Sequence, residues 1–117
     1  MAAGDTRVFA KPYDAVGSEF YIGIWFTTAQ WYAKNRALAK RFADVMYETA
    51  RWANAHHERT AAMLGRFSNI DSQTIASMAR ASFATALDPS VIQNQLNLAY
   101  RYHIISRPTT AIDLIAK

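Results

Sequence analysis

The sequence predicts a mainly α-helical chain with one or two β-strands near its N-terminus. Residues 29–117 carry apolar side chains at helical spacing, whereas residues 7–28 are aromatic and rich in β-forming residue types. Glycine and proline are scarce, with 4 and 3 copies in 117 residues, which disfavours a turn-dense β-sandwich. The length is that of one small domain. We therefore expect a single domain or a fragment of one, with a strand-rich segment at 7–28 and a helical segment at 29–117.

Two strands are expected in the first segment. Arg7–Ala10 is a short β-prone run that ends at Lys11 and Pro12, and the next strand covers Phe20–Thr27. The apolar residues of Phe20–Thr27 do not alternate with polar ones, which is typical of a strand buried on both faces of a sheet. Two short strands cannot provide that environment by themselves. We expect the exposed strand Phe20–Thr27 to pair between chains, giving a homo-oligomer.

The strongest helical pattern lies between Asn35 and Asn54. On its polar face, Lys40 and Asp44 are spaced for an ion pair, as are Glu48 and Arg51. The apolar positions that recur on the opposite face are Leu38, Phe42, Val45, Met46, Trp52 and Ala53.

Four further helical segments follow. We expect helices over His57–Phe67 and over Ser72–Phe83, the latter with Asp71 as its N-cap. Asp88 followed by Pro89 is a start signal for a helix that runs to about Tyr102. A last short turn, with Thr110 as its cap, is expected to end at Ile115.

The charge of the chain has a definite location. The formal net charge is +4, from 13 basic and 9 acidic residues. Residues 34–66 contain the whole surplus, which comes from Lys34, Arg36, Lys40, Arg41, Arg51, Arg59 and Arg66 set against Asp44, Glu48 and Glu58. This segment is either a contact for a phosphate backbone or an ordinary solvated helix face, and the interleaved acids favour the second interpretation.

No enzyme motif is present. Cysteine is absent, which excludes disulfides, thiolate metal sites and a cysteine nucleophile. His56, His57 and Glu58 are adjacent in sequence, but neighbouring side chains on a helix diverge by about 100°, so they do not form a two-histidine zinc motif. Glycine-rich phosphate loops and serine nucleophile elbows are also missing. We expect no catalysis, no metal and no cofactor.

Membrane and export signals are likewise missing from the sequence. The apolar run at residues 20–26 is far shorter than the roughly 20 residues of a membrane span. The first residues lack the basic and apolar regions of a secretory signal.

Short sequence elements occur in a fixed order along the chain. They are Thr27-Thr28, Trp31-Tyr-Ala-Lys-Asn35, Arg41-Phe with Met46-Tyr-Glu, Arg51-Trp-Ala-Asn-Ala-His56, Asn69-Ile-Asp71, Ala81-Ser-Phe-Ala84, Leu87-Asp-Pro89 with Ile92-Gln93, and Ile104-Ile-Ser-Arg-Pro108. From Arg7 to Ile115 this order resembles the C-terminal part of the periplasmic solute-binding proteins of ABC importers. The resemblance is to the group that includes the nitrate, sulfonate, taurine and thiamine-pyrimidine binders.

The resemblance implies a fragment of a two-lobed α/β periplasmic-binding-protein fold of type II, with the upstream lobe of the family absent from these 117 residues. It implies transport rather than catalysis, a small-molecule ligand, an ABC permease in the membrane as partner, and a periplasmic or membrane-anchored extracytoplasmic location. Tyr21 and Trp25 are the candidate ligand-binding residues. The alternative function is that of a basic helical interaction or nucleic-acid-binding domain, although we expect no nucleic acid as partner.

Overall fold

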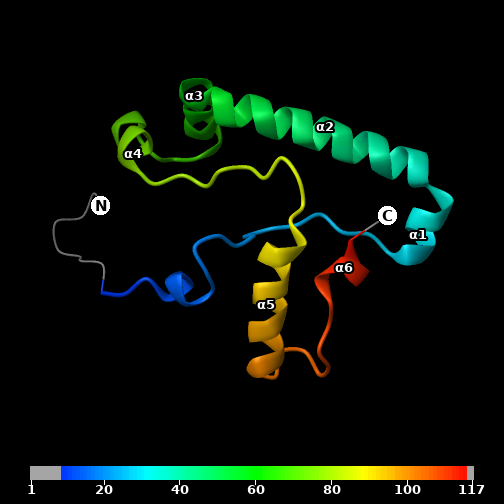
Figure 1. The fold of residues 1–117 in the computed structure, drawn as a ribbon. Coiled ribbons are helices and arrows are strands. Elements are labelled where there is room, and N and C mark those ends of the chain that lie inside the picture. The colour runs from blue at the N-terminus through cyan, green and yellow to red at the C-terminus, as the bar shows by residue number, and fades with distance from the viewer. Residues whose placement is uncertain (1–8, 116–117) are drawn as a thin grey trace. The chain divides into compact units, whose positions relative to one another are not determined.

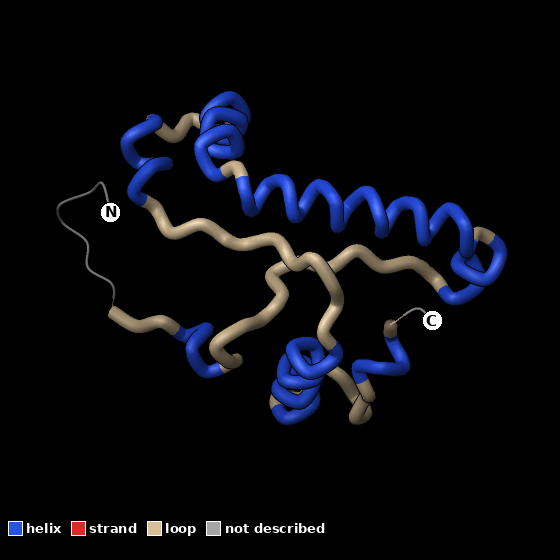
Figure 2. The backbone as a smooth tube through the Cα atoms, turned by 45° about the horizontal axis from the view of Figure 1, so that its top comes forward, coloured by secondary structure: helices blue, strands red, loops and turns tan. Residues whose placement is uncertain are grey.

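The structure is a computed structural model that describes residues 9–115. Over these residues the chain forms six α-helices and one short 3-10 helix, and it contains no β-strand (Figures 1 and 2). The described chain divides into two compact units. The first unit comprises residues 37–86, and the second comprises residues 9–36 together with residues 87–115. The mainly helical class predicted from the sequence is confirmed.

The first unit is built from α2 (Arg36–Ala55), α3 (His57–Phe67) and α4 (Ser72–Ser77). Helices α3 and α4 pack against each other, and Ile75 of α4 is 3% exposed. The Cδ1 atom of Ile75 lies 3.6 Å from the position that a Cβ atom on Gly65 would occupy. This distance is an ordinary van der Waals contact, so Gly65 of α3 lies directly beside the buried side chain of α4.

The second unit contains the 3-10 helix η1 (Pro12–Ala15) and the helices α1 (Ala29–Lys34), α5 (Pro89–Arg101) and α6 (Ala111–Leu114). Helix α6 packs on α5, and each contributes one buried residue, Ala111 and Ile92 respectively. The Gln93 carboxamide joins the two helices: it accepts a hydrogen bond from the Ala111 N–H at 2.8 Å and donates to the Thr109 carbonyl at 3.1 Å.

Side-chain caps set where three of the helices begin. Asp71 accepts hydrogen bonds from the backbone N–H groups of Gln73 and Thr74, and Asp88 accepts one from Ser90. Both caps were predicted from the sequence and are confirmed. The Thr28 hydroxyl caps α1 in the same way by accepting from the Trp31 N–H. Thr110 occupies the cap position of α6, but its side chain makes no capping hydrogen bond.

Helix α5 ends with a pair of backbone hydrogen bonds typical of the Schellman motif. The Ile104 N–H donates to the Ala99 carbonyl at 2.8 Å, and the His103 N–H donates to the Tyr100 carbonyl at 3.0 Å. His103 adopts the left-handed conformation that this motif requires, with φ of 59°. The predicted end of this helix at about Tyr102 is therefore within one residue of the observed end at Arg101.

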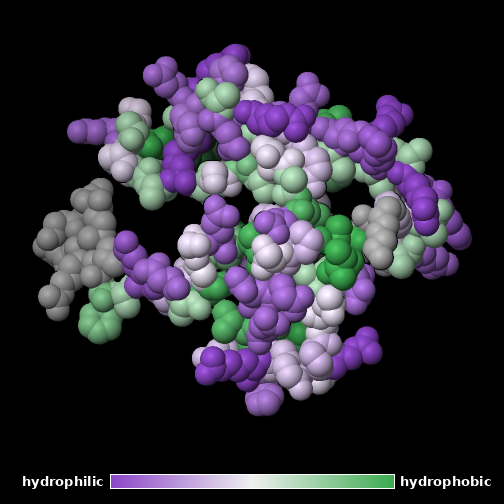
Figure 3. All heavy atoms as spheres, in the orientation of Figure 1, coloured by the Kyte–Doolittle hydropathy of each residue, from purple (hydrophilic) through white to green (hydrophobic). Residues whose placement is uncertain are grey.

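The long helix and its neighbour match their predicted extents. Helix α2 covers residues 36–55 where the sequence predicts 35–54, and α3 has the predicted bounds. The predicted pair Lys40–Asp44 is formed, with Nζ and Oδ2 2.6 Å apart. The predicted pair Glu48–Arg51 is not an ion pair in the described part of the chain. Hydrophilic side chains run along α2 in the view of Figure 3, as its predicted polar face requires.

The predicted length of the third helix is wrong. Helix α4 ends at Ser77, not at Phe83, and Met78 is already extended, with φ and ψ of −75° and 147°. Two long-range contacts hold the following residues out of the helix. The Asn54 carboxamide donates to the Phe83 carbonyl at 2.7 Å and accepts from the Phe83 N–H at 2.9 Å. The Arg80 guanidinium donates to the His57 carbonyl and to the Thr60 hydroxyl.

The predicted strand Phe20–Thr27 is also wrong. The segment has no regular secondary structure (Figure 2), because no second segment of the described chain lies beside it to complete a hydrogen-bonded ladder. Residues of these types favour a strand only where a neighbouring strand is present to pair with them. The other expected strand, at residues 7–10, falls partly outside the described residues, and its described part, residues 9 and 10, is not a strand.

We predict that the two aspartate caps make the protein acid-sensitive. Hydrogen bonds from the side chain and backbone of Thr74 lower the pKa of Asp71 below its ordinary value of 3.8, and those from Ser90 lower the pKa of Asp88 likewise. A lowered folded-state pKa stabilises the fold above pH 3.8, and this contribution is lost as the pH falls through the lower folded value. Replacing both residues with asparagine keeps the capping acceptors but removes the titration.

Urea unfolding measured from pH 7 to pH 2 tests this prediction. The free energy of unfolding of the wild type should fall more steeply below pH 4 than that of the Asp71→Asn, Asp88→Asn variant. Parallel pH profiles for the two proteins would contradict it.

Candidate functional site

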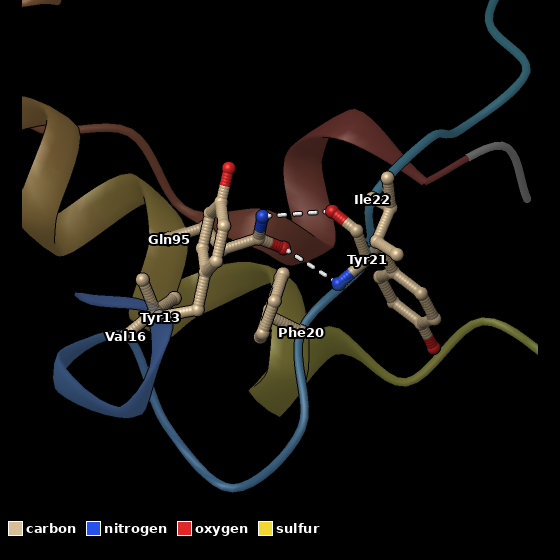
Figure 4. Close-up of a pocket in the computed structure, with 6 residues that line it drawn as sticks. All are labelled: Tyr13, Val16, Phe20, Tyr21, Ile22 and Gln95. Carbon is tan, nitrogen blue, oxygen red and sulfur yellow. Dashed lines mark hydrogen bonds between the residues drawn. The ribbon is translucent and has the colours of Figure 1, made fainter. Parts of the chain in front are cut away.

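A groove with a volume of about 350 Å³ lies within the second unit. The residues that line it come from η1, from the segment after η1 and from α5 (Figure 4). They are Tyr13, Val16, Phe20, Tyr21, Ile22 and Gln95.

Two stacked aromatic rings form one side of the groove. The ring centroids of Tyr13 and Phe20 lie 5.0 Å apart, with an interplanar angle of 16°. The chain returns from η1 to Phe20 through Gly17, whose φ of 152° is a conformation that residues with a side chain rarely adopt. The stacking of Tyr13 on Phe20 therefore depends on glycine at position 17.

Tyr21 is held by three hydrogen bonds. Its N–H donates to the Gln95 Oε1 at 3.1 Å, and its carbonyl accepts from the Gln95 Nε2 at 3.0 Å (Figure 4). The Tyr21 hydroxyl accepts from the Asp88 N–H at 2.9 Å. A carboxamide offers the same donor and acceptor as a peptide group, so Gln95 pairs with the extended backbone as a neighbouring strand would. These contacts fix the Tyr21 ring beside the groove.

The two candidate ligand residues are placed differently. Tyr21 lines the groove, whereas Trp25 does not and is 74% exposed. The groove therefore contains one of the two candidates. Sequence reasoning missed Tyr13, Phe20 and Gln95. Tyr13 and Phe20 precede and follow Gly17 in the sequence, and this pattern could have identified them as neighbours. Gln95 lies on a helix face, and nothing in the local sequence distinguishes it from other polar residues there.

The side chains that line the groove indicate which kind of ligand it would suit. The walls of the groove are mainly aromatic and aliphatic, and none of the six lining residues is Asp, Glu, His, Lys or Arg. The carboxamide of Gln95 uses one N–H donor and one acceptor site in its hydrogen bonds with Tyr21, and the Tyr13 hydroxyl is a further polar group at the aromatic wall. Such a groove suits a small ligand with a flat or apolar part.

The histidine pair and part of the basic segment make local contacts in the described structure. No group of three His, Cys, Asp or Glu residues between positions 9 and 115 could hold a metal ion. His56 instead stacks on Trp52, with ring centroids 4.8 Å apart, and its Nδ1 lies 2.7 Å from the Trp52 carbonyl oxygen. The Arg59 guanidinium covers the same Trp52 ring, with Cζ 5.0 Å from the ring centroid.

Two more of the basic side chains between residues 34 and 66 have local contacts. Arg36 lies over the Tyr32 ring at 5.5 Å, and Lys40 pairs with Asp44. Together with Arg59, these side chains make contacts within or next to their own helices, so part of the excess positive charge has a local stabilising role.

Comparisons of the chain with known protein families, with curated proteins and with solved structures find no match. Within the described residues, no helix combines the length and the apolar composition that a membrane crossing requires.

We predict that Gln95→Glu destabilises the second unit. At pH 7 the carboxylate can still accept from the Tyr21 N–H, but it has no donor for the Tyr21 carbonyl, so two acceptors face each other. The expected cost is about 1–3 kcal/mol in the free energy of unfolding.

Urea unfolding followed by tryptophan fluorescence measures this cost. Gln30→Glu is the matched control, because Gln30 is exposed in the first turn of α1, where an added negative charge is neutral or favourable. Equal stability of the two variants would contradict the assigned role of Gln95.

Proposed function

We propose that the chain is the C-terminal part of the solute-binding component of an ABC importer, and that it is not an enzyme. The ligand is a small molecule of the nitrate, sulfonate, taurine or pyrimidine type. In this proposal the chain belongs to a two-lobed protein outside the cytoplasm, and an ABC permease in the membrane is its partner.

The observation that carries the proposal is that the sequence elements of the resemblance coincide with residues on which the local structure depends. Asn54 and Phe83, which are joined by two hydrogen bonds, lie in two different elements. The capping residues Asp71 and Asp88 lie in two more, and so does Gln93, which joins α5 to α6.

The groove gives secondary support. It is concave, mainly apolar and lined by aromatic side chains, as small-molecule sites commonly are. Tyr21, which lines it, and Trp25, four residues further along the same extended segment, are the side chains that we expect to contact the ligand in the whole protein. Their separation in the structure is consistent with a site that other parts of that protein complete.

The experiment is performed on the native product. The protein is isolated from its source organism with an antibody to this chain, its intact mass is measured, and its melting temperature is followed with nitrate, taurine, an alkyl sulfonate and the thiamine pyrimidine. We expect a mass well above 13.2 kDa and a higher melting temperature with one of these ligands. A ligand at 100 times its Kd would stabilise the protein by about 2.7 kcal/mol.

The site is tested in the same protein by Trp25→Ala, which should raise the Kd for that ligand at least tenfold. Phe67→Ala is the control, since Phe67 is 90% exposed at the end of α3 and has no proposed ligand contact. A native product of 13.2 kDa that no ligand stabilises would contradict the proposal. Duplex DNA bound at low salt by that product would favour the alternative, a basic nucleic-acid-binding domain.

A further inference from the structure

The lining of the groove in the second unit contains no counter-charge for an ion. Three of its residues are aromatic, two are aliphatic, and the sixth is the neutral Gln95. Moving an ion out of water into such a site is costly unless an opposite charge lies beside it. The lining therefore suits an uncharged ligand better than a charged one.

The two stretches of chain that form the groove carry negative charge only. Residues 12–22 contain Asp14 and Glu19, residues 88–95 contain Asp88, and neither stretch contains Lys, Arg or His. The Asp88 N–H is hydrogen-bonded to the hydroxyl of the lining residue Tyr21 at 2.9 Å. Lys11, which immediately precedes the first stretch, is the base nearest to it in the sequence. An anion in the groove would thus lie among like charges, which is unfavourable.

One wall of the groove is flat. The rings of Tyr13 and Phe20 are nearly parallel, with an interplanar angle of 16° and centroids 5.0 Å apart (Figure 4). Tyr13 is 64% exposed, so the stacked pair is accessible from solvent. Aromatic rings associate favourably in offset stacks, and a planar ligand can extend this one.

The polar groups of the lining are neutral as well. The Gln95 carboxamide has two N–H donors, and one of them is used in its hydrogen bond to the Tyr21 carbonyl. The second N–H makes no hydrogen bond within residues 9–115. Together with the Tyr13 hydroxyl, it offers a contact to an amide, a hydroxyl or a ring nitrogen of a ligand.

We infer that this groove binds an uncharged molecule with a planar ring and discriminates against anions. Its volume of about 350 Å³ lies near the lower end of the range of about 300–1,000 Å³ for small-molecule sites. The inference rests on the proposed function, in which the chain binds a small molecule, and it narrows that function to one class of ligand. Among the proposed ligand types, it favours the heterocycle over nitrate and the sulfonates.

Three small probes separate the effect of charge from that of shape. Benzamide is planar and uncharged, benzoate has nearly the same shape but a negative charge, and cyclohexanecarboxamide keeps the amide without the planar ring. The full chain, labelled with ¹⁵N, is titrated with each probe at pH 7 and followed by NMR. Benzamide should give saturable shifts of the Tyr21 N–H and of the Gln95 side-chain amide. The dissociation constants of the other two probes should be higher by about tenfold or more.

A pair of variants tests whether the stacked wall holds the ring. Tyr13→Ala should raise the dissociation constant of benzamide about fivefold or more. Phe9→Ala is the control and should leave it unchanged, since Phe9 is 92% exposed and does not line the groove. Circular dichroism of both variants should show the helix content of the wild type.

Three results would overturn the inference: no saturable shift at the groove with benzamide, binding of benzoate or cyclohexanecarboxamide as tight as that of benzamide, or equal effects of the two variants. Failure of the transport proposal is seen separately. A native product of 13.2 kDa would contradict that proposal but would not change the shifts measured with the isolated chain.

Discussion

Three carboxamide side chains, those of Asn54, Gln93 and Gln95, tie the irregular segments of this protein to its helices. Each accepts a hydrogen bond from one backbone N–H and donates to a backbone carbonyl of a segment that is distant along the chain. Irregular segments have no ladder of their own, so their polar backbone groups need partners from elsewhere. The carboxamides provide these partners, and the position of each irregular segment within its unit depends on them.

This arrangement matters because the apolar core is small. Among the described residues, only Ala50, Ile75, Ile92 and Ala111 are buried, and two of these are alanines. Hydrophobic burial alone therefore fixes few segments. The direction of the chain after α4 and the position of Tyr21 beside α5 follow from paired hydrogen bonds. The groove exists because Gln95 and the Gly17 turn bring Tyr21 and the Tyr13–Phe20 stack to the same side of α5.

Local signals predicted most of the helices, but the short helix α1 was not predicted as an element of its own. Long-range contacts explain the other failures. Apolar periodicity gave α2 and α3 to within a residue, and the cap signals at Asp71 and Asp88 gave two helix starts. The end of α4 was mispredicted because it depends on Asn54, which lies 29 residues before its partner Phe83. Residues 20–27 were assigned to a strand because their composition favours one, but a strand also needs a neighbour, which a local pattern cannot provide.

The site was predictable only in part, for the same reason. Tyr21 was selected from the aromatic pattern, whereas Gln95 lies 74 residues away and looks like any other polar residue on a helix. The sequence resemblance suggests a transport function. The structure shows which residues of the short sequence elements that carry this resemblance make long-range contacts. Asn54, Phe83 and Gln93 belong to both sets.

The central claim is that carboxamide side chains hold the irregular segments in place. Amide hydrogen exchange of the full chain, resolved by NMR, tests this claim most directly. The N–H groups of Tyr21 and Phe83 should be protected, although both residues lie outside every helix, whereas the neighbouring N–H groups of Ile22 and Gly23 should exchange freely when the protein is monomeric. Exchange of Tyr21 and Phe83 at the same rate as Ile22 and Gly23 would contradict the account.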